Sequence, residues 1–146
     1  MDGMSTEINN PTTKPCDRSR ILVADDEAPV RHLFSTILSY GVPEARIDQA
    51  CNGLEAVKTF QGAHHGVILM DLRMPEMDGF NAALAIRDFC RTQNWQMPSI
   101  VFCTGFAPPT ALDEIIGDGK LHGLLRKPVT SEQIITTVKS RLQAMA

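Results

Sequence analysis

The sequence lacks a long hydrophobic run, an excess of basic charge and a secretion signal, and each absence excludes a class of protein. No apolar stretch in the 146 residues approaches the ~20 residues that a membrane-spanning helix needs. The first residues carry no apolar core of a signal peptide. The net charge of −3 offers no basic surface to a nucleic acid. We therefore expect a cytoplasmic protein that binds neither membranes nor nucleic acids directly.

Paired cysteines and phosphate-binding glycine motifs are also missing. The four cysteines form no CxxC pair, so neither a disulfide framework nor a zinc site is indicated. The chain contains no GxGxxG and no GxxxxGK, which makes a nucleotide or flavin binder a weak alternative. These absences leave a reduced, cytosolic type of protein without a nucleotide site.

The composition fits one folded domain preceded by a tail. The apolar content of 43% in 146 residues suits a single hydrophobic core. Residues 1–18 are rich in asparagine, threonine, proline and serine, which is typical of a mobile segment. We therefore expect a flexible N-terminal tail over residues 1–18 and a domain over residues 19–146.

Five short apolar runs alternate with helical patterns along the domain. The expected strands are Ile21 to Ala24, Ile47 to Ala50, Val67 to Met70, Ser99 to Cys103 and Leu121 to Leu125. Between them, apolar residues recur at helical spacing, as in the set Val30, Leu33, Phe34, Ile37 and Leu38. This alternation predicts an α/β fold of five βα units around a parallel sheet with helices on both faces.

Polar residues follow four of the five expected strands. Asp25 and Asp26 follow the first, Asp71 the third, Thr104 the fourth and Lys127 the fifth. In parallel α/β sheets, functional groups gather at the carboxyl ends of the strands. Three neighbouring carboxylates would repel one another by about 4 kcal/mol per close pair at an intermediate effective dielectric constant. A Mg²⁺ ion, which prefers oxygen ligands, would remove this repulsion.

The pattern predicts phosphoryl chemistry at these residues. We expect Asp25 and Asp26 to bind Mg²⁺, and Asp71 to bind it too and to act as a nucleophile that forms an acyl phosphate. Lys127 and Thr104 would then contact the phosphoryl oxygens, which supplies a two-state switch. Taken singly, each residue has an ordinary explanation, such as a helix-dipole, turn-forming or solvated role. Their order along the chain favours the functional one.

With these residues in hand, the chain resembles the response regulator receiver domains of bacterial two-component signalling. The resemblance covers roughly residue 20 to the C-terminus and is carried by ILVADDE, ACNGLEAV, VILMDLRMPEMDG, VFCTG and LLRKP. It implies a flavodoxin-like (βα)5 fold with strand order 2-1-3-4-5. It also implies that Asp71 receives its phosphoryl group from a sensor histidine kinase or a histidine phosphotransfer protein. The backbone carbonyl of Arg73 would be a further metal ligand, and the Lys127–Pro128 bond would be cis.

Three positions qualify the resemblance. Leu124 stands where the family often carries a tyrosine or phenylalanine that moves during switching, so the signal would spread through the backbone or smaller packing changes. Arg73 and Phe106 line the mouth of the site in this family. A long cation and a bulky ring there suggest restricted water access and slow hydrolysis of the phosphoryl group.

Several functional alternatives remain open. We expect a free-standing receiver without an attached output module, which controls a downstream protein. We do not expect an enzyme that acts on other substrates, because the domain would catalyse only its own phosphoryl transfer and dephosphorylation. A phosphorylation-dependent dimer is a further option. The sequence also fits a receiver taken from a hybrid histidine kinase. A haloacid dehalogenase-type phosphatase would use an aspartyl nucleophile too, but it would carry an acid where Arg73 stands. A receiver that has lost its chemistry is disfavoured by the intact set of acids.

A few conspicuous residues receive simpler interpretations. We expect His64 and His65 to form an exposed pair in a loop, because they have no partner at metal-ligand spacing. The methionines at 70, 74 and 77 are expected to pack around the loop after the third strand, and Cys103 is expected in the core.

Overall fold

The computed structural model describes residues 12–105, 109–116 and 122–145. The elements are β1 (Asp17–Ala24), α1 (Ala28–Gly41), β2 (Arg46–Ala50), α2 (Gly53–Ala63), β3 (His65–Met70), α3 (Gly79–Gln93), β4 (Ser99–Thr104), the 3-10 turn η2 (Thr110–Leu112), α4 (Asp113–Ile116), β5 (Gly123–Arg126) and α5 (Ser131–Ala144). Among these residues, no helix is both long enough and apolar enough to cross a membrane.

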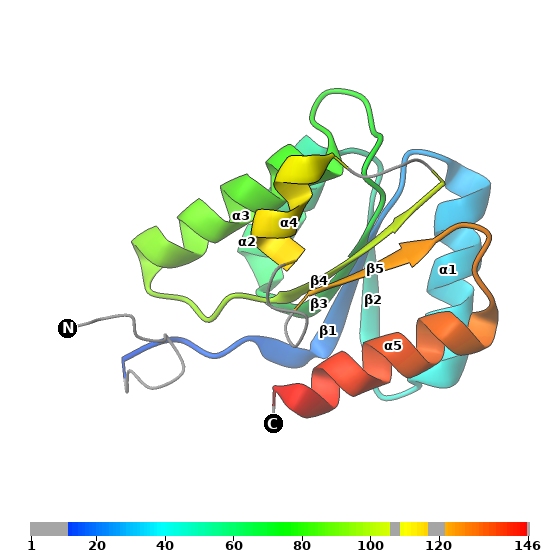
Figure 1. The fold of residues 1–146 in the computed structure, drawn as a ribbon. Coiled ribbons are helices and arrows are strands. Elements are labelled where there is room, and N and C mark those ends of the chain that lie inside the picture. The colour runs from blue at the N-terminus through cyan, green and yellow to red at the C-terminus, as the bar shows by residue number, and fades with distance from the viewer. Residues whose placement is uncertain (1–11, 106–108, 117–121, 146) are drawn as a thin grey trace.

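The five strands form one parallel sheet in the order β2-β1-β3-β4-β5. Helices α2, α3 and α4 cover one face of the sheet, and α1 and α5 cover the other (Figure 1). The predicted flavodoxin-like fold and its strand order are therefore confirmed. The carboxyl ends of all five strands lie along the same edge of the sheet, as parallel pairing requires.

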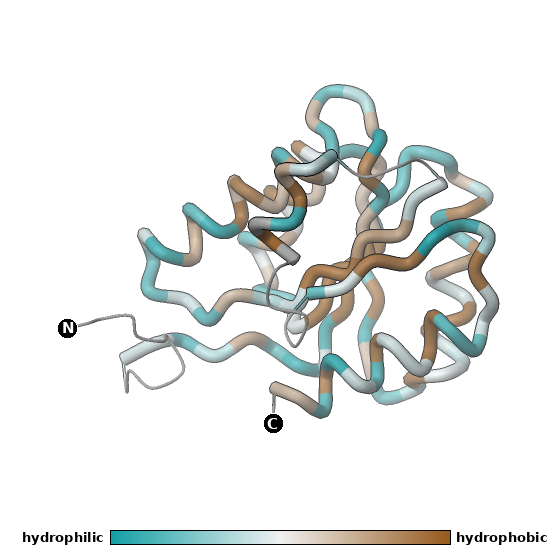
Figure 2. The backbone as a smooth tube through the Cα atoms, in the orientation of Figure 1, coloured by the Kyte–Doolittle hydropathy of each residue, from teal (hydrophilic) through white to brown (hydrophobic). Residues whose placement is uncertain are grey.

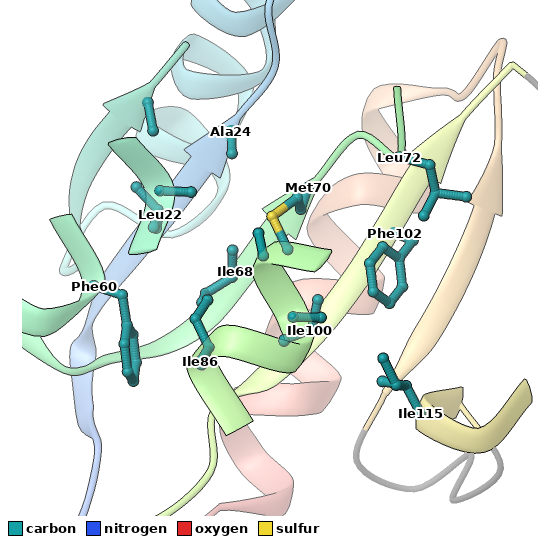
Figure 3. Packing of buried hydrophobic residues seen from close by; sticks show 14 of the residues in the cluster. Leu22, Ala24, Phe60, Ile68, Met70, Leu72, Ile86, Ile100, Phe102 and Ile115 are labelled. Atoms are coloured by element: carbon teal, nitrogen blue, oxygen red, sulfur yellow. The ribbon is translucent and has the colours of Figure 1, made fainter. Parts of the chain in front are cut away.

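Each face of the sheet has its own hydrophobic core. Leu22 and Ala24 face the core under α2 and α3, whereas Ile21 and Val23 face the core under α1 and α5. Figure 3 shows part of the first core, where side chains from the strands meet Ile86 of α3 and Ile115 of α4. Figure 2 shows the hydrophobic stretches concentrated in the central strands. The buried segments of the central strands, such as residues 21–24 and 67–70, are continuous apolar runs, as expected for strands covered on both faces.

The N-terminal boundary differs from the expected one. Lys14 forms a parallel bridge with Trp95, with hydrogen bonds from Lys14 N to Asn94 O at 3.0 Å and from Gln96 N to Lys14 O at 2.8 Å. Cys16 is buried. Residues 12–18 are thus part of the folded unit, because their backbone finds partners in the loop between α3 and β4. Residues 1–11 lie outside the described residues.

His64 and His65 are buried, so the prediction of an exposed pair is wrong. His64 ends α2 in the left-handed conformation, and its ring stacks on Trp95 with centroids 4.2 Å apart. His65 begins β3, and its Nε2 lies 2.7 Å from Oδ2 of Asp48. Both partners are distant in sequence, and local polarity alone did not reveal them.

One detail of a helix and one of a strand also differ from expectation. Leu33, expected on the buried face of α1, is 56% exposed; the buried residues of this helix are Phe34, Ser35 and Leu38. Residue 121, expected in the last strand, lies outside the described residues, and β5 begins at Gly123. Cys103 is buried in the core, as expected.

Candidate functional site

Asp25, Asp26 and Asp71 come together because β1 and β3 are adjacent and in register. Ala24 pairs with Met70, so the two strands end side by side and the next residues face the same edge. The Asp71 amide donates to the Ala24 carbonyl at 3.0 Å. One carboxylate oxygen from each aspartate lies within 4.8 Å of the others. The structure therefore forms the acidic cluster that the strand ends predicted.

The three carboxylates differ in exposure. Asp25 is 1% exposed and Asp71 is 7% exposed, whereas Asp26 is open to solvent. Each buried carboxylate accepts a backbone N–H two residues further on: Asp25 Oδ1 from Glu27 at 2.9 Å, and Asp71 Oδ1 from Arg73 at 3.3 Å. These turns fix the two buried side chains, whereas the exposed Asp26 marks the side from which an ion in solvent can reach the cluster.

Lys127 joins the two buried carboxylates. Its Nζ donates to Asp25 Oδ2 at 3.0 Å and to Asp71 Oδ2 at 3.1 Å. Burial lowers the pKa of the ammonium group, but the hydrogen bonds and charges of Asp25 and Asp71 outweigh this, so the pKa is raised. The lysine thus remains charged and offsets the repulsion within the cluster. The Lys127–Pro128 bond is cis, as the resemblance implied.

Thr104 is the last residue of β4 and is fully buried. It lies two residues beyond Phe102, which pairs with Met70 of β3. The Thr104 carbonyl accepts the Lys127 N–H at 2.9 Å. Thr104 and Lys127 are therefore joined through the backbone at the edge of the sheet that carries Asp71.

The loop after Asp71 is shaped by two close backbone approaches. The Gly79 N–H donates to Leu72 O at 2.8 Å, and the Gly53 N–H donates to Met77 O at 2.9 Å. A Cβ atom on Gly79 would collide with the Asp71 carbonyl oxygen, and one on Gly53 would collide with the Met77 carbonyl oxygen. Only glycine allows these contacts without movement of the loop.

An open depression of about 400 Å³ adjoins the acidic cluster. Its lining residues are Asp26, Leu72, Arg73, Met74 and Asp78. Arg73 is exposed at this rim, as expected for a residue at the mouth of the site. Phe106, the other predicted rim residue, lies outside the described residues. Met70 and Met74 are buried and Met77 packs partly against the same core, which agrees with a packing role.

The donor set of the cluster fits a hard divalent cation. All three side chains offer oxygen, and Mg²⁺ binds through one or two carboxylates while keeping several waters. The exposed Asp26 and the adjoining depression leave room for such waters and for a phosphoryl group. Asp25, Asp26 and Asp71 are thus suited to hold Mg²⁺; the role of the Arg73 carbonyl stays a prediction.

Leu124 lies on β5 opposite Phe102 of β4 and packs partly buried against the core under α2 and α3. The receiver domains that the sequence resembles often carry a tyrosine or phenylalanine at this position. The aliphatic side chain has no hydroxyl to exchange hydrogen bonds when the site changes state.

One residue near the site was missed at the sequence level. Arg31 of α1 donates from Nη1 to the backbone carbonyl of Asp25 at 2.8 Å. A basic residue in the first turn of the helix that follows a strand-ending aspartate was the available signal. It carries little weight alone, because most arginines on helices are solvated.

Comparison with known proteins agrees with this geometry. Residues 21–139 match the response regulator receiver domain family. The regulatory protein AtoC of Escherichia coli is 31% identical over 125 residues, which cover 86% of this chain and 25% of that protein. The osmosensing histidine protein kinase SLN1 of Saccharomyces cerevisiae is 32% identical over 144 residues, covering 92% of this chain and 11% of that kinase. The chain therefore spans only a small part of these relatives.

Solved structures share the fold. The Vibrio cholerae chemotaxis protein CheY4 aligns with a TM-score of 0.67 at 24% identity, covering 83% of this chain and 96% of that one. A receiver domain from Clostridium thermocellum aligns with a TM-score of 0.68 at 21% identity, covering 86% and 94%. With the sequence match spanning most of the domain, the sheet order and the acidic edge acquire one explanation: the chain belongs to the response regulator receiver domains of two-component signalling.

Proposed function

We propose that Asp71 is the phosphoacceptor of a two-component or phosphorelay system and takes its phosphoryl group from a phosphohistidine. The observation that carries this proposal is the buried Asp71 carboxylate, held beside Asp25 and Asp26 and hydrogen-bonded to Lys127 at 3.1 Å. The side chain of such a carboxylate is held in a fixed orientation and is partly desolvated, and the neighbouring cation stabilises negative charge next to it. The chain would act on itself and its partners rather than turn over a separate substrate.

The transfer follows from the charges at the site. An Asp71 oxygen forms a bond to phosphorus as the phosphorus–nitrogen bond of the phosphohistidine breaks, and the departing imidazole takes up a proton. When bound, Mg²⁺ held by Asp25, Asp26 and Asp71, with the Arg73 carbonyl, would stabilise the charge on the phosphoryl oxygens. The Lys127 ammonium and the Thr104 hydroxyl would contact the transferred group. Arg73 at the rim would restrict access of hydrolytic water.

The partners follow from the same chemistry. The phosphoryl donor would be a sensor histidine kinase or a histidine phosphotransfer protein, and a downstream protein would read the altered surface. Relatives include both a regulatory protein and histidine kinases. A free-standing receiver and a receiver within a hybrid kinase are therefore both compatible with the proposed transfer. We expect either form to work in the cytoplasm.

The proposal is tested by intact mass measurement after incubation with acetyl phosphate, with and without Mg²⁺. We expect one added phosphoryl group that depends on Mg²⁺ and is absent from Asp71→Asn. The matched control is Asp88→Asn, which alters a carboxylate on α3 whose side chain is 69% exposed. Phosphorylation of Asp71→Asn to the native extent, or repeated turnover of a phosphate ester as in a haloacid dehalogenase-type enzyme, would overturn it.

A further inference from the structure

Arg31 connects three elements at the acidic edge of the sheet. It lies in the first turn of α1, and its Nη1 donates to the backbone carbonyl of Asp25 at 2.8 Å. Its Nε donates to Oε1 of Gln49, on β2, at 3.1 Å. One planar guanidinium group therefore ties the end of β1 to the edge strand β2 and to α1.

Asp25 is restrained at all of its other polar atoms as well. Its N–H donates to the Ala50 carbonyl at 3.1 Å, and its Oδ1 accepts the Glu27 N–H at 2.9 Å. Its Oδ2 accepts from the Lys127 ammonium at 3.0 Å. Arg31 supplies the remaining contact, at the carbonyl where the chain leaves the strand and turns toward α1. Without it, rotation of the peptide after Asp25 would be restrained by the turn alone.

We infer that Arg31 is a positioning residue for Asp25, which it holds in the orientation that binds Mg²⁺. The inference rests on the proposed function, because it assumes that Asp25 is a metal ligand. Groups that orient metal ligands typically change metal affinity by ~10–100-fold when removed. The guanidinium fork has two donors in fixed geometry, which a lysine ammonium cannot reproduce across the same two acceptors.

The contact has a second consequence for switching. Lys127 hydrogen-bonds Asp25 in the structure, but the proposed transfer gives that ammonium a phosphoryl group to contact instead. Asp25 then loses a side-chain partner on Oδ2. The Arg31 bond is made to the backbone and does not involve Lys127, so it keeps Asp25 in place in both states.

The test is the Mg²⁺ affinity of the metal-free full chain, measured by calorimetric titration. We expect Arg31→Ala to bind Mg²⁺ about tenfold or more weakly than the native chain. Arg31→Lys should lie between the two. Gln49→Ala, which frees only the Nε end of the guanidinium, should weaken binding a few-fold. The control is His32→Ala, which changes the exposed neighbour on α1 and should keep native affinity.

Circular dichroism and urea unfolding of each metal-free variant separate positioning from stability. Weakened Mg²⁺ binding by a variant that is fully folded at the titration temperature supports the inference. Native affinity, within twofold, in Arg31→Ala overturns it. Should Arg31→Ala fail to fold, Arg31→Lys and Gln49→Ala decide: reduced affinity supports the inference, and native affinity in both overturns it. Absence of Mg²⁺ binding by the native chain would instead overturn the proposed function on which the inference rests.

Discussion

Buried and half-buried ionisable residues of this domain are stabilised in opposite charge states. Lys127 stays charged because two carboxylates accept its hydrogen bonds. His64 and His65 have lowered pKa values, first because burial disfavours the imidazolium, although the Gln96 carbonyl near His64 and the Asp48 carboxylate near His65 oppose this. The acidic edge of the sheet thus depends on a half-buried cation, whereas the other end of β3 depends on neutral rings.

Because of these two histidines, we expect the free energy of unfolding to fall at mildly acidic pH. Their folded-state pKa values lie below the unfolded value of about 6.5, so the unfolded chain takes up protons first as the pH falls. Stability is therefore full above this pH and declines below it, by at most about 1.4 kcal/mol per histidine between pH 7.5 and 5.5. Urea unfolding at the two pH values should show this decline in the native chain.

Two variants assign the decline to its source. His65→Gln, and His64→Asn, which suits the left-handed backbone at that position, should each be less stable at pH 7.5 but lose less on acidification. The control Ile86→Val costs roughly 0.5–1.5 kcal/mol through packing and should keep the full pH effect. An unchanged pH effect in both histidine variants would contradict the assignment.

The sequence predicted the site residues better than their surroundings. Asp25, Asp71 and Thr104 could be placed because parallel strands put their ends together, whatever the details of packing. The burial of His64 and His65 could not be predicted, since it depends on Trp95 and Asp48, which reach them only after the sheet has formed. Polar residues between elements look exposed until such partners are known.

Helix α2 contains two glycines with opposite roles. Gly53 begins the helix against the Met77 carbonyl, which belongs to the loop that follows Asp71. Gly62 lies near the end of the same helix, and a Cβ atom there would meet nothing within 4 Å. The first glycine is required by a tertiary contact, whereas the second lowers helix stability without any such reason.

We expect Gly53→Ala and Gly62→Ala to change stability in opposite directions. Gly53→Ala should destabilise the domain by about 1–3 kcal/mol, because the added methyl group forces the loop backbone to move. Gly62→Ala should stabilise it by roughly 0.5–1 kcal/mol through helix propensity. Urea unfolding of the metal-free variants measures both, and each variant serves as the control of the other. Equal effects would mean that the contact with Met77 O carries no energy.

Element boundaries were predictable where apolar runs are long and local signals agree. The capping box of α5, with Thr130 and Gln133, follows the sequence rule. In contrast, Thr110 is a residue type that often caps helices, but it lies inside η2, and Pro109 precedes the turn without a side-chain cap. The extension of the fold back to residue 12 depends on pairing with residues 94–96, a contact that no local pattern encodes.

On the scale of the whole molecule, burial differs between the centre and the edges of the sheet. β3 and β4 are buried at every residue, whereas the edge strands β2 and β5 are half-buried or exposed at most positions. Within the described residues, α4 spans Asp113–Ile116 and contributes Ile115 to the core (Figure 3), next to Leu112 of η2 in the same cluster. Elements with few buried contacts open at the lowest free-energy cost. Both edges of the sheet are therefore easier to reshape than its centre.

Phosphorylation should alter hydrogen exchange mainly at the β5 edge, where the proposed contacts of the phosphoryl group lie. Thr104 ends β4 and Lys127 directly follows β5, and these two residues are the proposed contacts of the phosphoryl group. The opposite edge strand, β2, meets the acidic cluster through the bond of Gln49 to Arg31 and through the Ala50 carbonyl. With acetyl phosphate and Mg²⁺ present, amide exchange in β5 and α4 should change by about fivefold or more, as coupling of ~1 kcal/mol implies. Exchange in β2 should stay within twofold.

Asp71→Asn under the same conditions supplies the control, because it keeps the fold and the reagents but removes the acceptor. Leu124 offers no aromatic ring to relay the change, so we expect the backbone hydrogen bond from Lys127 N to Thr104 O to carry it from the site to β5. An equal change of amide exchange in β2 and β5 would contradict this expectation.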